Sequence, residues 1–146
     1  LRYSFTFQKF CIENILTKNI IMDTLLLKYK TVKEDEVKVW FKAAPVSAFS
    51  KDGGACVKYK DLQIAVFNFS RLNKWYACQN LSPEKKEMVL SRGMLGDDKG
   101  TPKVACPLHK KTFSLETGEN LNGDLDAIAT YPVKIEEENV YIGFLE

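Results

Sequence analysis

The sequence predicts a single all-β domain, built as an antiparallel sandwich or a partly open barrel. Three observations support this class. Apolar and polar residues alternate with period two in several short runs. Turn-forming residues separate these runs at intervals of roughly eight to twelve residues. A length of 146 residues and a hydrophobic content of 45% suit one domain with one sizeable core.

The first 21 residues differ in character from the rest. They contain neither a continuous apolar stretch nor a small-residue cleavage site, which argues against a secretory signal. Because position 1 is not Met, we expect residues 1–21 to be an upstream extension and the natural product to begin at Met22. The single domain then covers residues 22–146. The alternative is a short terminal helix, because several apolar residues fall partly on one helical face: Phe7, Phe10, Cys11, Ile15 and Ile21.

The first half of the domain carries the clearest strand patterns. Residues 37–41 alternate and predict a strand, whereas residues 44–49 favour one helical turn. The β-rich runs 56–59 and 62–69 flank Lys60 and Asp61, whose composition is typical of a hairpin turn. Both faces of the second run are largely apolar, which predicts a strand covered on both sides.

The second half continues with short strands. They are predicted over residues 73–79, 104–106, 112–115, 128–135 and 140–144. Residues 136–139 (EEEN) are typical of a solvated hairpin turn between the last two. No internal repeat and no low-complexity linker interrupts the series.

Composition excludes several classes of function. A formal net charge of +2 predicts neither nucleic-acid binding nor attraction to a membrane surface. No apolar run approaches the roughly 20 residues needed to cross a bilayer. The four cysteines show no paired spacing, which favours free thiols and a reducing cytoplasm.

The most informative motif is Cys106-Pro107-Leu108-His109. A thiol and an imidazole three residues apart across a turn can reach the same point in space. Alone, the pattern is weak: it is equally half of a metal site or a buried thiol beside an exposed histidine.

The surrounding sequence resembles the Rieske iron–sulfur family. There, one loop reads C-x-H and a second C-x-x-H, and the second is typically followed by F-x-L-x-T-G-E, which residues 113–119 (FSLETGE) match. The first loop usually reads N-x-C-P-H with L-S-x-G further on, and here residues 80–84 read NLSPE and residues 90–93 read LSRG. Ser82 therefore occupies the cysteine position and Glu84 the histidine position. The resemblance implies two antiparallel sheets, with the two loops forming a smaller lobe.

The resemblance is closer to one branch, the small subunit of assimilatory NAD(P)H nitrite reductase. It covers about residues 37–144 and is strongest over residues 75–120. This implies a cytoplasmic accessory subunit, structural or regulatory and not catalytic alone. Its partner would be a large subunit that carries flavin, sirohaem and its own iron–sulfur centre. A free-standing domain with a partner outside nitrogen metabolism is an alternative.

The replaced ligands predict that the cluster is lost and that no cofactor is bound. A Rieske centre needs two thiolates on one iron and two imidazoles on the other. Ser82 offers a poorer donor than a thiolate, and Glu84 changes both charge and geometry. Two alternatives remain: an electron carrier that retains an atypical [2Fe-2S] cluster, and zinc held by Glu84, Cys106 and His109.

Lysines crowd the two loops and suggest a docking surface. A basic tip can dock on an acidic surface of a larger subunit, although exposed lysines more often serve solubility. The candidates are Lys85, Lys86, Lys110 and Lys111.

Overall fold

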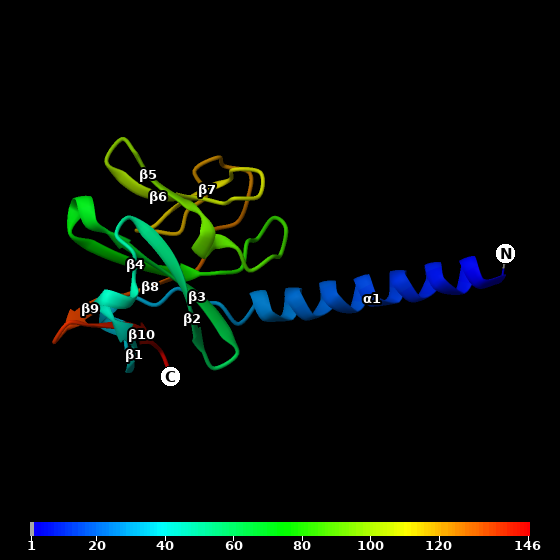
Figure 1. Ribbon diagram of the computed structural model, residues 1–146, viewed down its shortest axis with the longest axis horizontal. Helices are drawn as coiled ribbons and strands as arrows, with labels where there is room; N and C mark the ends of the chain where they lie inside the picture. The colour runs from blue at the N-terminus through cyan, green and yellow to red at the C-terminus, as the bar shows by residue number, and fades with distance from the viewer. Residues whose placement is uncertain (1) are drawn as a thin grey trace.

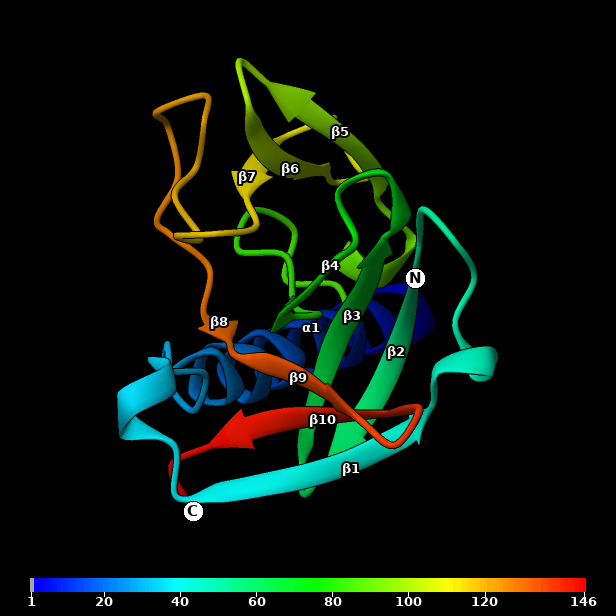
Figure 2. The ribbon, with the colours of Figure 1, turned by 90° about the vertical axis from the view of Figure 1, so that its left-hand side faces the viewer.

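The computed structural model describes residues 2–146, with side chains described from residue 12 onward. In this part of the chain, one long helix precedes ten strands in three antiparallel sheets (Figures 1 and 2). The expected all-β, antiparallel architecture is confirmed, and the described sheets form no closed barrel. None of the described helices is long and apolar enough to cross a membrane.

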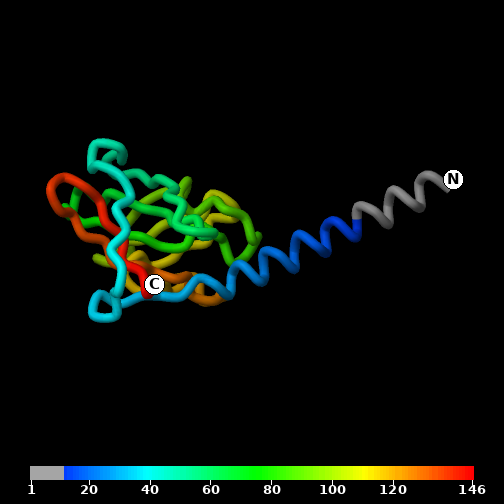
Figure 3. Tube along the Cα trace, turned by 90° about the horizontal axis from the view of Figure 1, so that it is seen from below, coloured from blue at the N-terminus to red at the C-terminus, as the bar shows by residue number. Residues whose placement is uncertain are grey.

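Helix α1 (Arg2–Leu26) occupies the segment for which we expected an upstream extension or a short helix. It extends away from the β domain (Figure 3). At its C-terminal end, Met22, Leu25 and Leu26 pack against the core of the domain. The preceding apolar side chains remain more than half exposed: Ile12, Ile15, Leu16, Ile20 and Ile21.

The first sheet has the order β1-β10-β9, with β1 at Val39–Pro45, β10 at Asn139–Phe144 and β9 at Val133–Glu136. Its register pairs Val39 with Phe144, so the sheet joins the two ends of the domain. The acidic turn between β9 and β10 forms the hairpin that the sequence predicts.

The second sheet has the order β2-β3-β4-β8. Its strands are β2 (Gly53–Tyr59), β3 (Leu62–Phe69), β4 (Lys74–Gln79) and β8 (Thr130–Tyr131). The predicted hairpin at residues 60–61 joins β2 to β3. Strand β3 is covered on both faces, as its two apolar faces indicate, because successive residues alternate between two hydrophobic clusters.

The run predicted as one strand over residues 128–135 is two strands. Pro132 separates β8 from β9, since proline has no N–H to continue a ladder. Its carbonyl still accepts a hydrogen bond from the Gly143 N–H at 2.9 Å. The chain therefore leaves the second sheet at Tyr131 and enters the first at Val133.

The third sheet, order β5-β6-β7, lies in the lobe that carries the two loops. Strand β5 (Met94–Asp98) is not among the predicted strands, and it pairs with β6 (Thr101–Ala105), which pairs with β7 (Thr112–Ser114). The lobe thus contains a sheet of its own, in addition to the two sheets expected. Single turns of 3-10 helix complete the domain: Glu34–Glu36, Val46–Ala48, Ser70–Leu72 and Leu90–Arg92.

Two hydrophobic clusters lie on opposite faces of the second sheet. One fills the space against the first sheet and includes Val66 and Ile142. The other fills the space beneath the lobe and includes Phe67, Leu90 and Phe113. The two loops therefore lie above the second cluster.

Candidate site where the two loops meet

The first loop, residues 80–90, is closed by its own backbone. The Ser82 N–H donates to the Glu87 carbonyl, and the Lys86 N–H donates to the Ser82 carbonyl, both at 2.8 Å. Asn80 is buried at the base of the loop and accepts a hydrogen bond from the Ser91 N–H through its side chain at 2.7 Å. Asn80 thus ties the start of the loop to its end.

The second loop, residues 106–111, connects β6 to β7. The Cys106 N–H donates to the Lys111 carbonyl at 2.7 Å, which closes the loop at its base. His109 and Lys110 both have positive φ, 58° and 55°, so the backbone turns sharply at the tip. Beneath both loops lie three buried side chains: Leu90, Phe113 and Leu115.

The structure brings all four candidate ligand positions together in two pairs. The inner pair is buried: the Cys106 thiol donates a hydrogen bond to Ser82 Oγ at 3.7 Å, and both residues are 1% exposed. The outer pair is more open: His109 Nδ1 lies 3.3 Å from Glu84 Oε1. The His109 side chain is 58% exposed, and the Glu84 side chain is 23% exposed. Each loop contributes one member of each pair.

The two pairs are arranged like the ligands of a Rieske centre, of which two bind one iron and two bind the other. The inner pair holds the two residues that the motif resemblance assigns to the thiolate positions, and the outer pair holds the two that it assigns to the imidazole positions. Two atoms bound to one tetrahedral ion at about 2.3 Å lie about 3.8 Å apart, which is close to the separation of Cys106 Sγ and Ser82 Oγ. The backbone frame therefore suits paired ligands, while the side chains are one thiol, one hydroxyl, one imidazole and one carboxylate. This set does not fit a cluster that needs two thiolates and two imidazoles.

Cys78 does not replace the missing thiolate. It lies in β4, is fully buried, and packs in the cluster beneath the lobe. Burial raises the pKa of its thiol, which keeps it protonated. Cys56, Cys78 and Cys106 are all free thiols in the described part of the chain.

The zinc alternative is not supported. Among the residues whose side chains are described, no group of three or more His, Cys, Asp or Glu side chains is arranged to hold a metal ion. Glu84 instead pairs with His109, and its second carboxylate oxygen is buried without a hydrogen-bond partner there.

Two of the four candidate docking lysines are already paired. Lys86 forms an ion pair with Asp23 of α1, and Lys111 forms one with Asp124. The hydrogen bond to Asp124 raises the pKa of Lys111 and keeps its ammonium charged. Lys85 and Lys110 are exposed and form no ion pair within the described residues. Of the four candidate lysines, these two therefore keep an unpaired positive charge.

The contact between α1 and the first loop was not predicted. Lys18 lies 3.4 Å from Glu87, next to the ion pair of Asp23 and Lys86. No local pattern identifies such pairs, because their members lie far apart in the sequence. Helix α1 therefore lies directly beside the loop that carries Ser82 and Glu84.

Two loops that bring four side chains together in two pairs, at one end of a small antiparallel β domain, are characteristic of the Rieske class. The family model for the Rieske-like [2Fe-2S] domain matches residues 39–143, and the chain belongs to this family.

Within the family, the similar proteins include nitrite reductases and a dioxygenase ferredoxin subunit. The chain is 26% identical over 98 residues to the nitrite reductase (NADH) small subunit of Escherichia coli K12, which covers 67% of this chain and 91% of that protein. The nitrite reductase [NAD(P)H] small subunit of Erwinia carotovora has a solution structure that superposes with a TM-score of 0.63 at 29% identity, covering 73% of this chain and 82% of that one.

A larger relative contains a similar segment. The nitrite reductase [NAD(P)H] large subunit of Klebsiella oxytoca is 36% identical over 104 residues, which is 71% of this chain but 11% of that protein. The chain thus spans about a tenth of the length of that relative.

Proposed function

We propose that this protein is a small accessory subunit of a cytoplasmic NAD(P)H-dependent nitrite reductase, in which direct contacts between the loops replace the [2Fe-2S] cluster. The observation that carries this proposal is the composition of the two pairs at the loops: Ser82 with Cys106, and Glu84 with His109. The role is structural or regulatory, because one thiol and one imidazole cannot complete the ligands of two irons. The large subunit would carry out the chemistry.

The chemistry of the inner pair supports the loss of the cluster. A serine hydroxyl stays protonated near neutral pH and is a much poorer donor to iron than a thiolate. In this protein the Ser82 hydroxyl has a hydrogen-bonding role that needs no metal, because it accepts the hydrogen bond of the buried Cys106 thiol. A buried polar group with a partner avoids most of its desolvation cost.

The protein made in cells supplied with iron should therefore be colourless and free of iron. Visible absorption and iron analysis of the purified chain measure this directly. Two irons per chain together with the absorption of a two-iron cluster would contradict the proposal. That result would favour the alternative of a ferredoxin-like electron carrier with an atypical centre.

The loop tip is our candidate surface for the large subunit, and Lys85 and Lys110 are its free charges. Reversal of both to Glu should slow association with the large subunit and weaken the dependence of association on salt, because complementary charge acts mainly on the encounter rate. Stopped-flow association over a range of ionic strength measures both quantities.

The matched control reverses Lys51 and Lys58, two exposed lysines of the β2 region that lie outside the loops. Both double variants change the net charge equally, so a difference between them reports position. Equal effects of the two variants, or no effect of either, would place the interface elsewhere.

A further inference from the structure

Helix α1 is joined to the first loop by two ion pairs of opposite polarity. Asp23 of the helix pairs with Lys86 of the loop, and Lys18 Nζ lies 3.4 Å from Glu87 Oε1. All four side chains are partly exposed, from 34% for Lys86 to 60% for Lys18. Exposed ion pairs are weak and are screened by salt, so salt should loosen this contact.

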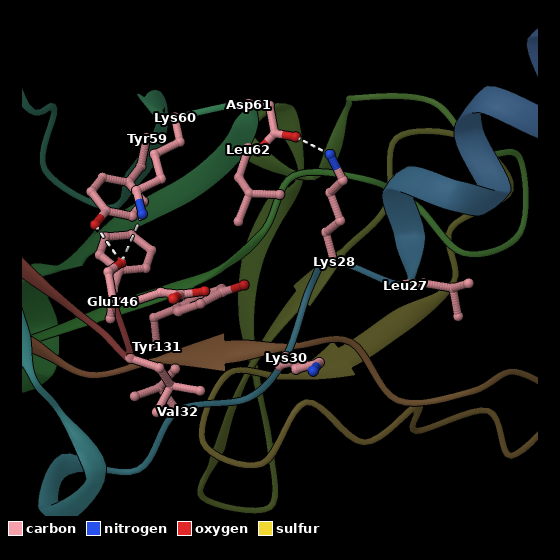
Figure 4. Close-up of a pocket in the computed structure, with 12 residues that line it drawn as sticks. Leu27, Lys28, Lys30, Val32, Tyr59, Lys60, Asp61, Leu62, Tyr131 and Glu146 are labelled. Carbon is pink, nitrogen blue, oxygen red and sulfur yellow. Dashed lines mark hydrogen bonds and ion pairs between the residues drawn. The ribbon is translucent and has the colours of Figure 1, made fainter.

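The chain just after α1 is anchored on the domain. Beside the cavity shown in Figure 4, Lys28 forms an ion pair with Asp61 of the turn between β2 and β3. Tyr29 is 7% exposed, and its hydroxyl accepts a hydrogen bond from the Gln63 N–H at 3.1 Å and lies 3.8 Å from Met88 Sδ. Because Tyr29 is buried, the chain should stay anchored at the C-terminal end of α1 when salt screens the ion pairs.

The two loop residues that pair with α1 are those whose backbone closes the loop on Ser82. The Lys86 N–H donates to the Ser82 carbonyl, and the Ser82 N–H donates to the Glu87 carbonyl, both at 2.8 Å. Lys86 has a φ of 52°, in the left-handed region that costs energy for a residue with a side chain. Such a conformation persists only where its surroundings hold it, and the ion pair with Asp23 is one of the contacts that do so.

The first loop also covers the Cys106 thiol. Cys106 is 1% exposed, and its thiol donates a hydrogen bond to Ser82 Oγ at 3.7 Å. Because Ser82 belongs to the first loop, movement of this loop away from the second would uncover Cys106 Sγ. Local opening of this kind needs less free energy than unfolding of the whole domain.

We propose that α1 is a strap that keeps the first loop closed over the Cys106 thiol, and that the strap loosens as salt screens the ion pairs of Lys18 and Asp23. Opening of the loop then exposes the thiol while the domain remains folded. This inference does not rest on the proposed function, because it concerns contacts within the isolated chain.

Alkylation of the full chain by iodoacetamide, an uncharged reagent, measures the opening when each cysteine is followed by mass spectrometry. Cys56 is exposed and corrects for any direct effect of salt, whereas Cys78 is fully buried and reports unfolding of the domain. Raising sodium chloride from about 0.02 M to about 0.5 M should speed alkylation of Cys106 about threefold relative to Cys56, with Cys78 unlabelled. A ratio that does not change with salt would overturn the proposal.

Charge variants test the strap itself at low salt. Asp23→Lys sets two positive charges against each other and should speed alkylation of Cys106 about threefold or more. Adding Lys86→Glu restores opposite charges and should return the rate close to that of the unmodified chain. The matched control is Glu13→Lys, an equal change of charge at an exposed residue of α1 that forms no ion pair within the described residues, and it should leave the rate unchanged. Equal effects of Asp23→Lys and Glu13→Lys, or no recovery in the charge-swapped variant, would show that the ion pairs do not hold the loop.

Discussion

Replacement of Ser82 by Cys together with Glu84 by His should convert this chain into a coloured iron–sulfur protein on reconstitution. The double change restores two thiolates and two imidazoles at positions that already lie in pairs. The backbone of both loops is closed by its own hydrogen bonds, so we expect the frame to form without metal. Iron content near two per chain and the visible spectrum of a two-iron cluster are the expected readouts.

The single variants are the controls for this conversion. Ser82→Cys alone supplies three of the four ligands, as does Glu84→His alone, and neither should yield a stable two-iron centre. Adding Cys106→Ser to the double variant should abolish the colour again. A folded double variant that takes up no iron would show that the loops have lost the ligand geometry of the family as well as its residues.

Truncation of Phe113 to Ala should lower the free energy of unfolding by about 3–5 kcal/mol. Phe113 is fully buried and pairs with Val104 across the lobe sheet. In the cluster beneath the loops it lies with Leu90 and Leu115. Because we propose that no metal holds the loops together, the packing of this ring is what stabilises them. No metal–ligand bond would compensate for its loss. Equilibrium unfolding in urea measures the change.

Met94→Ala is a suitable control for Phe113→Ala. Met94 lies in β5 of the same lobe, but it is 78% exposed. Its truncation should change the free energy of unfolding by less than about 0.5 kcal/mol. A loss below about 1 kcal/mol for Phe113→Ala would mean that the lobe is already loosely packed in solution.

Most of the fold could be predicted because its strands carry local signals. The alternation in β3 and the composition of its turn to β2 indicate a hairpin without any knowledge of the partner sheets. Strand β5 was missed because it is largely exposed and contains Gly96, Asp97 and Asp98, which are typical of turns. The break at Pro132 was missed because the flanking residues form one continuous β-rich run.

The candidate site was predicted by a different route. Ser82 and Glu84 have no chemical signature of their own, and only the flanking Rieske-like motif marks their positions. Their pairing with Cys106 and His109 then follows from the fold. The neutralisation of Lys86 and Lys111 could not be predicted, because Asp23 and Asp124 carry no sign of their partners in the sequence.

The pairing of β1 with β10 has a consequence for the order in which the chain folds. Pro45 pairs with Asn139, so the first sheet cannot close until nearly the whole domain has been synthesised. The hairpins of the lobe, in contrast, join neighbouring residues and can form early. Until β10 arrives, β1 presents an unpaired strand edge, which is a route to aggregation. The nascent chain is thus most vulnerable at the end of the molecule opposite the loops, in the interval before its last strand is made.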